Sequence, residues 1–460
     1  MSTHSLIDQL QFSRQYFNSG ITKSYSFRRQ QLQKLKSSIG KYESDLNQAL
    51  FNDLKKSPEE AWVTELGFVI AEINYAIKNL SQWMRPERVR TNLLNFPSSS
   101  YILKEPLGVV LVIGPWNYPL QLLFSPLVGA IAAGNCTVLK ASEFAPETAS
   151  VMKRIIEETF SQQYVLFVEG SGQEIVPDMM NNFRFDYVFY TGSTAVGKLI
   201  YKMAADQLVP VTLELGGKSP CVIESDANLR VAARRIATAK FSNAGQMCVA
   251  PDYILVQNKV KQQFISQLRD AITESFSQNP SEDYNYCKIV NEKQFRRLMN
   301  FLNRATIVHG GRNDVSKLYI EPTIVEDPSL DSPLMKDEIF GPILPVISFE
   351  DFRQAKSIID QSPDPLAFYI YTSSKKKERQ WISQIPAGGV CVNNSSWHLT
   401  NPHLPFGGRG SSGFGRYHGR SSFETFSHRK SVMKTPTWFD PKIKHPPFKG
   451  KLWLFKKVIK

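Results

Sequence analysis

Cysteine is scarce in this chain of 460 residues, and the few that occur are not arranged to bind a metal or to form a disulfide framework. The five cysteines lie at positions 136, 221, 248, 287 and 391, without a Cys-x-x-Cys pair or a zinc-like Cys/His spacing. The N-terminus also lacks the basic start and apolar core of a secretory signal. We therefore expect no metal site and a reducing compartment, the cytoplasm.

Charged residues are missing from the long stretch 107–139, which would be long enough to cross a bilayer. However, Gly114, Pro115, Pro119 and Pro126 interrupt this stretch and would break a spanning helix. We expect a buried strand, a loop, a buried helix and a second strand here instead.

Acidic residues are missing from segment 441–460, which has seven lysines and supplies about half of the net charge of +13. The rest of the chain is only mildly basic, which argues against a nucleic-acid partner. The basic tail, residues 436–460, also carries Trp453, Leu454 and Phe455, so it could form an interfacial helix that touches anionic lipid. The alternative is a helix that packs on the protein with a solvated lysine face.

The order of hydrophobic patterns predicts an α/β fold. Residues 1–80 read as helical, and 85–106 resembles a hairpin with its turn near 96–100. From residue 107 onward, strands alternate with helices, which predicts a parallel sheet with right-handed crossovers. The predicted strands are 109–113, 137–139, 165–168 and 186–190, and the helices between them are 120–133 and 146–160.

A second α/β unit is expected after Glu214, because a chain of this length needs two or three domains. Its predicted helices are 229–241 and 260–276, and its strands are 253–256 and 343–347. We expect 281–337 to be rich in loops, 395–415 to be irregular and 423–432 to form a strand.

Two segments carry the residue types needed for a two-step reaction. Glu214 begins the run Glu-Leu-Gly-Gly-Lys-Ser-Pro at the end of a predicted strand, and Cys248 follows Asn243, Gly245 and Gln246 just past a predicted helix. A thiol can attack a carbonyl, and a carboxylate can then deliver water to the resulting thioester. Taken alone, the cysteine could be a small buried hydrophobe and the glutamate a surface carboxylate at a strand end.

A third segment, Gly-Pro-Trp-Asn-Tyr-Pro, places Asn117 in a loop between Pro115 and Pro119. A buried asparagine often only closes a turn. It can also be a neutral donor to an oxyanion, together with the backbone N–H of Cys248.

The three segments, in their order along the chain, closely resemble the signature segments of the aldehyde dehydrogenase superfamily, and in particular its compact class 3 branch. The resemblance runs from about Tyr101 to Lys430. It implies that Cys248 is the nucleophile, Glu214 the general base and Asn117 the oxyanion donor. It also implies a homodimer in which each subunit has three structural parts. These are a Rossmann-type dinucleotide-binding domain (1–83 and 106–213), an α/β catalytic domain (214–421) and a β oligomerisation arm (84–105 and 422–435).

The same resemblance implies that NAD or NADP is the cofactor. Ala141 stands where class 3 members usually carry proline, which leaves the choice between the two open. Each charged residue of this set could also be an ordinary solvated side chain. The implied cofactor residues are Trp116, Lys140, Glu143, Gly192, Ser193, Gly197, Glu338 and Phe340, and the implied substrate-tunnel residues are Tyr118 and Phe406.

The expected function is NAD(P)-dependent oxidation of aliphatic or aromatic aldehydes to carboxylic acids through a thiohemiacetal and a thioester on Cys248. A coenzyme-A-acylating relative is one alternative, although it has less need of a base such as Glu214. The other alternative is a non-catalytic protein that kept the scaffold and binds a lipid surface. The presence of all three reactive groups argues against it.

Overall fold

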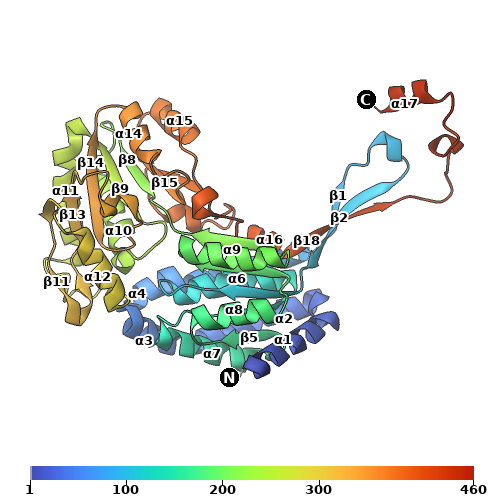
Figure 1. Cartoon of the computed structure of the whole chain (residues 1–460), viewed down its shortest axis with the longest axis horizontal. Helices are drawn as coiled ribbons and strands as arrows, with labels where there is room; N and C mark the ends of the chain where they lie inside the picture. The colour runs from blue at the N-terminus through green and yellow to red at the C-terminus, as the bar shows by residue number, and fades with distance from the viewer. Residues whose placement is uncertain (1–2, 460) are drawn as a thin grey trace.

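A computed structural model describes residues 3–459, which form two α/β bodies and an arm that projects from them (Figure 1). The N-terminal region is helical, as predicted, and Tyr42 separates two of its helices. The first helices are α1 (Thr3–Asn18), α2 (Tyr25–Lys41), α3 (Glu43–Leu54), α4 (Pro58–Ala61) and α5 (Gly67–Trp83), with the π-helical segment η2 (Trp62–Leu66) joining α4 to α5.

The first body contains a six-stranded sheet of order β17-β7-β6-β3-β4-β5. All of its strands are parallel except β17, which pairs antiparallel with β7. The strands are β3 (Val109–Ile113), β4 (Cys136–Lys140), β5 (Val165–Val168), β6 (Tyr187–Gly192), β7 (Val211–Leu215) and β17 (Gly413–Phe414). The helices are α6 (Pro119–Ala133), α7 (Pro146–Thr159), α8 (Gly172–Asn182) and α9 (Thr194–Asp206).

The uncharged stretch forms β3, α6 and β4, as predicted. Every residue of α6 is buried, which explains why this helix is apolar on all sides. No helix within residues 3–459 is long and apolar enough to cross a membrane.

The second body contains a seven-stranded sheet of order β10-β13-β14-β9-β8-β15-β16. Its strands are β8 (Pro220–Ile223), β9 (Tyr253–Gln257), β10 (Ile307–His309), β13 (Thr323–Glu326), β14 (Ile343–Phe349), β15 (Ala367–Tyr371) and β16 (Gly389–Val392), with a small separate pair, β11 (Asn313–Asp314) and β12 (Tyr319–Ile320). Its helices are α10 (Leu229–Phe241), α11 (Lys261–Phe276), α12 (Glu292–Phe301), α13 (Pro333–Lys336), α14 (Phe352–Ile359) and α15 (Lys375–Gln384).

Two of the sequence predictions for the second half of the chain were wrong in part. Residues 281–337 include α12, which buries Phe295, Leu298 and Phe301 at helical spacing. The strand expected at 423–432 begins only at Ser427, because Phe423 lies buried in α16 (Arg420–Thr425). The segment 395–415 is irregular, as predicted, with only the short turns η7 (Trp397–Thr400) and η8 (Gly410–Ser412) and the two-residue β17.

The arm is a three-stranded antiparallel sheet of order β1-β2-β18, which extends away from both bodies (Figure 1). Its strands are β1 (Glu87–Val89), β2 (Ser99–Pro106) and β18 (Ser427–Lys434), with the turn η3 (Leu93–Asn95) between the first two. The basic tail continues beyond the arm and contains η9 (Lys442–Lys444) and α17 (Leu452–Val458). Before reaching the arm, the chain returns to the first sheet through β17, a pairing that the predicted domain division does not include.

Candidate active site

One cavity of about 250 Å³ gathers the three reactive residues from distant parts of the sequence. Asn117 reaches it from the loop before α6, Glu214 from β7 and Cys248 from the turn after α10. The full lining is Pro115, Trp116, Asn117, Leu122, Thr191, Gly192, Ser193, Glu214, Leu215, Gly216, Cys248, Gln294, Arg297, Glu338 and Phe340. Groups of three or more metal-binding side chains are absent from residues 3–459.

Glu214 lies near the carboxyl end of β7, where parallel strands commonly present reactive groups. The side chain is 3% exposed, and within residues 3–459 neither carboxyl oxygen has a hydrogen-bond partner. Burial raises the pKa of Glu214 well above the usual value of a glutamic acid. The carboxyl group therefore holds a proton more readily than a solvent-exposed glutamate does.

Cys248 follows a turn with an unusual backbone. Asn243 and Ala244 both have φ of 50° and Gly245 has φ of 73°, so three consecutive residues are left-handed. An added Cβ at Gly245 would also overlap the carbonyl of Gly341. Such a turn needs support from its surroundings, since left-handed residues other than glycine cost roughly 1–2 kcal/mol each.

The Cys248 thiol is half-buried and faces the cavity. Burial raises its pKa to about 12, and the nearby carboxyl groups of Glu338 and Glu214 act in the same direction. The sulfur therefore keeps its proton at neutral pH in this conformation, and attack on a carbonyl requires that this proton be removed.

Asn117 is tied to the segment that carries Cys248. Its Nδ2 donates to the carbonyl of Gln246 at 3.0 Å, and its own carbonyl accepts from Nδ2 of Asn243 at 2.9 Å. These contacts join positions far apart in the sequence, so Asn117 does more than close a local turn. Its side chain lines the same cavity as Cys248.

Five of the predicted cofactor residues line the same cavity: Trp116, Gly192, Ser193, Glu338 and Phe340. The rings of Trp116 and Phe340 meet edge to face, with centroids 5.4 Å apart. Ser193 caps α9, because its Oγ accepts from the N–H of Val196. Burial, with Asp252 next in importance, raises the pKa of Glu338 to about 8.

The other predicted cofactor residues lie outside the lining. Lys140 ends β4, where its Nζ donates to the carbonyl of Ala141 at 2.6 Å and lies 3.5 Å from Glu143. Glu143 accepts from the N–H of Gly172 at 3.0 Å. Gly197 allows α9 to approach β7, since an added Cβ would lie 2.6 Å from Leu215. The N-terminus of α9 after β6, and a lysine and a carboxylate after β4, lie at the carboxyl ends of strands on either side of β3, an arrangement that fits a dinucleotide with its phosphates and ribose hydroxyls.

The predicted substrate-tunnel residues are not among those that line the cavity. Tyr118 is buried beneath Lys56, whose Nζ lies 4.0 Å from its ring centroid. Phe406 is buried against the rings of His398, Tyr417 and His418. A contact of either residue with substrate stays a prediction.

The sequence analysis missed two polar residues of the lining, Gln294 and Arg297. Arg297 donates to Oε1 of Gln294 at 2.7 Å and to the carbonyls of Glu338 and Ile339 at 3.2 and 2.7 Å. It thereby fixes the backbone that carries Glu338 and Phe340. Their spacing of three residues on one helix was the available signal, but this segment was predicted to be loop-rich.

A mostly parallel sheet whose strand ends share a cavity with a thiol, a carboxyl group and an amide is the arrangement expected of an α/β enzyme. Comparison with known proteins identifies the family. Residues 12–432 match the model of the Aldehyde dehydrogenase family, and the chain belongs to that family.

Named relatives extend over nearly the whole chain. A Staphylococcus aureus protein named 4,4'-diaponeurosporen-aldehyde dehydrogenase is 46% identical over 450 residues, covering 97% of this chain and 98% of the relative. The dimeric NADP-preferring aldehyde dehydrogenase of Rattus norvegicus is 40% identical over 450 residues, covering 97% of this chain and 99% of the relative.

Solved structures agree with this assignment. The substrate-bound state of Staphylococcus aureus AldH has a TM-score of 0.96 and 45% identity, covering 98% of this chain and 99% of that one. An NAD+ complex of a Bacillus cereus aldehyde dehydrogenase has a TM-score of 0.84 and 28% identity, covering 93% of this chain and 88% of that one. The predicted fold and family are confirmed: this protein is an aldehyde dehydrogenase that oxidises aldehydes with NAD or NADP.

Proposed function

We propose that Cys248, Glu214 and Asn117 carry out the oxidation in two stages. The observation that supports this most strongly is their convergence on one cavity from three separate segments. In the first stage the thiol gives its proton to water and the sulfur forms a bond to the carbonyl carbon of the aldehyde. The carbonyl oxygen becomes an oxyanion, which accepts hydrogen bonds from Nδ2 of Asn117 and the backbone N–H of Cys248.

Collapse of the oxyanion expels a hydride from the same carbon and leaves a thioester on Cys248. NAD or NADP, when bound, supplies the acceptor for that hydride. We propose that it is held by Trp116, Lys140, Glu143, Gly192, Ser193, Gly197, Glu338 and Phe340. Trp116 and Phe340 border the cavity between them, and Glu338 offers a carboxyl group to hydroxyls.

In the second stage Glu214 takes a proton from water as the water oxygen attacks the thioester carbon. The carbon–sulfur bond breaks, the carboxylic acid departs and the sulfur regains a proton. Burial without a hydrogen-bond partner in the described chain supports this role, because it keeps the pKa of Glu214 high enough for it to accept and release a proton.

We infer that the acceptor of the acyl group is water rather than coenzyme A, since a base at Glu214 serves hydrolysis. Product analysis tests this with an aliphatic and an aromatic aldehyde, each with and without coenzyme A. Free acid at equal rates in both conditions is expected, whereas a requirement for coenzyme A would contradict the proposal. The aldehyde for which the Staphylococcus aureus relative is named belongs in the same panel.

We also propose that the protein is a homodimer. Helix α9 exposes Val196 and Leu199 on one face, and Leu208 just beyond its end is 87% exposed. An unpartnered apolar face beside a projecting β arm suits association between two copies. The rat relative is named as dimeric. Light scattering after size exclusion should give twice the chain mass of 52.2 kDa, and a single chain mass would refute the dimer.

A cytoplasmic location with peripheral lipid contact is a further part of this proposal. The five cysteines are all free thiols, which suits a reducing compartment. The basic tail exposes Trp438, Leu452 and Trp453 among its lysines. Co-sedimentation with anionic vesicles should fall when the chain ends at Pro441. Unchanged binding of the shortened protein would exclude residues 442–460 as the contact.

A further inference from the structure

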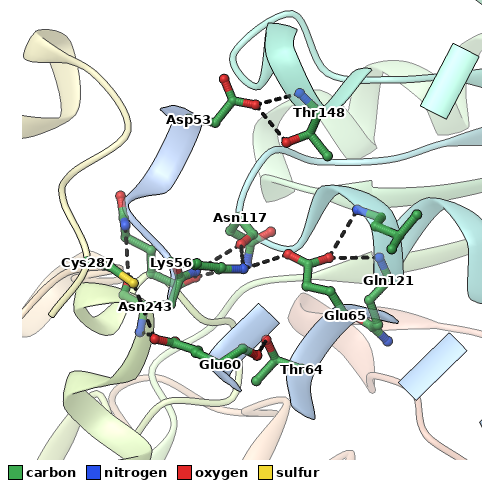
Figure 2. Close-up of polar contacts among 12 residues, drawn as sticks. Asp53, Lys56, Glu60, Thr64, Glu65, Asn117, Gln121, Thr148, Asn243 and Cys287 are labelled. Carbon is green, nitrogen blue, oxygen red and sulfur yellow. Dashed lines mark hydrogen bonds and ion pairs between the residues drawn. The ribbon is translucent and has the colours of Figure 1, made fainter. Parts of the chain in front are cut away.

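We propose that Lys56, Glu60 and Glu65 are positioning residues for the oxyanion site. Together they fix the loop that carries Asn117 against the turn that precedes Cys248 (Figure 2). None of the three lines the cavity. The inference rests on the roles proposed above for Asn117 and Cys248 and adds a cause for their relative placement.

Lys56 connects the N-terminal helices to the Asn117 loop. Its Nζ donates to Oε1 of Glu65 at 2.6 Å and to the backbone carbonyl of Asn117 at 2.9 Å. It also lies over the ring of Tyr118, the next residue in the loop. The side chains of Lys56 and Glu65 are both fully buried, so solvent does not weaken this contact.

Glu65 fixes the helix that follows the same loop. Its second oxygen, Oε2, accepts from the N–H groups of Leu120 and Gln121 at 3.1 and 2.9 Å. These are among the first N–H groups of α6, which have no partner within the helix. A carboxylate at this end also interacts favourably with the helix dipole. Both ends of the short Asn117 loop segment are therefore held by one ion pair.

Glu60 holds the other half of the site. Its Oε1 accepts from the backbone N–H of Asn243 at 2.8 Å, and its Oε2 accepts from the thiol of Cys287 at 3.3 Å. Asn243 begins the left-handed turn that leads to Cys248. Nδ2 of Asn243 donates to the Asn117 carbonyl, the same oxygen that Lys56 holds. The network thus closes into a continuous path between the two loops (Figure 2).

The three residues come from one short stretch, 56–65, which includes α4 and most of the π-helical η2. A buried ion pair is weak evidence for net stability, because desolvation of both charges offsets their attraction. Precise placement is a better reason to retain this one. A donor displaced by about 1 Å can lower a reaction rate by about 100-fold.

A double-mutant cycle separates positioning from a general structural role. The quantity measured is the single-turnover rate of NADH or NADPH formation per titratable Cys248, with saturating benzaldehyde and cofactor. Lys56→Met should lower this rate by about 10-fold in the otherwise unchanged protein. It should have little effect in Asn117→Ala, where the amide that it positions is gone. If Lys56→Met lowered the rate by the same factor in the unchanged protein and in Asn117→Ala, the proposal would be overturned.

Glu60 offers a second test that does not remove a buried charge pair. Glu60→Gln keeps an oxygen that can accept from Asn243, whereas Glu60→Ala removes it. The glutamine variant should retain most of the single-turnover rate, and the alanine variant should lose about 10-fold. Equal rates in the two variants would contradict a positioning role for Glu60, even if Lys56→Met failed to fold.

Lys261→Met is the matched control, because Lys261 is a buried lysine that pairs with Glu326 and Asp327 in the second body. Its single-turnover rate should equal that of the unchanged protein. A loss as large as that of Lys56→Met would mean that removal of any buried, paired lysine slows the reaction, which would overturn the proposal. If Asn117→Ala itself reacts at full rate, the proposed role of Asn117 fails. Equal factors combined with a slow Asn117→Ala refute the positioning role alone.

Discussion

Two buried glutamates, in two neighbouring regions, have opposite surroundings. Glu65, beside the Asn117 loop, gives one oxygen to Lys56 and the other to two N–H groups. Glu214, in the cavity, has no hydrogen-bond partner for either oxygen within residues 3–459. Burial raises the pKa of both, but only Glu65 has a lysine and N–H donors to counter it.

This difference separates residues that stabilise the structure from residues that are free to react. A carboxylate with every oxygen occupied cannot take up a proton without breaking contacts that fix the backbone. A carboxyl group without partners in the protein destabilises the fold when ionised, yet it can exchange a proton with water. Changes in the cavity should therefore affect turnover, and changes near Glu65 should affect stability and placement.

The largest expected effect is the loss of all oxidation in Cys248→Ala, because no other group in the proposed chemistry can form the thioester. Steady-state production of NADH or NADPH from benzaldehyde measures it. Cofactor binding, followed by quenching of intrinsic fluorescence, should be unchanged. Measurable turnover by this variant would place the nucleophile elsewhere.

Glu214→Gln should lower steady-state turnover by about 10²–10⁴-fold, the usual contribution of a general base. The first stage does not need this base, so one equivalent of NADH or NADPH per site should still form rapidly. Stopped-flow absorbance distinguishes this burst from the slow phase. Turnover at the original rate would assign the base to another residue.

Glu65→Ala should lower the free energy of unfolding by about 3–5 kcal/mol, because it leaves Lys56 as a buried charge without its partner. Urea denaturation measures this change. Glu326→Ala is a suitable control, since Lys261 keeps a second partner in Asp327. A loss as small as that of the control would mean that the Lys56 pair is not the structural element described here.

The smallest effect concerns the dependence of stability on pH. The folded pKa of Glu214 is raised, so its contribution is fully present below the unfolded pKa of about 4.3 and is lost as pH rises through the folded value. Glu214→Gln lacks this titration. Its advantage in unfolding free energy over the unchanged protein should therefore grow with pH, to about 1–3 kcal/mol. A difference independent of pH would show that burial does not raise the pKa of Glu214.

The sequence predicted the reactive groups of the site better than their support. Glu214, Cys248 and Asn117 stand in long distinctive motifs, and the strand before Glu214 was visible as the strand-like run 211–213. All three residues indeed share one cavity. Their roles, like those of the cofactor residues, stay predictions until the variants above are measured.

Lys56, Glu60 and Glu65 could not be recognised from the sequence, because they lie in a helical stretch whose charges resemble an ordinary solvated face. Only the tertiary contacts with Asn117 and Asn243 reveal that they point inward. Gln294 and Arg297 were missed for a different reason. Their helix has only 10 residues, and the turns around it dominated the local pattern.

The most direct measurement is the mass of Cys248-containing peptides from Glu214→Gln, quenched in acid after reaction with benzaldehyde and oxidised cofactor. We predict a benzoyl group on Cys248 in close to one equivalent per chain, because the thioester forms rapidly but is hydrolysed slowly. An acyl group on any other side chain, or on none while the cofactor is reduced, would contradict the account.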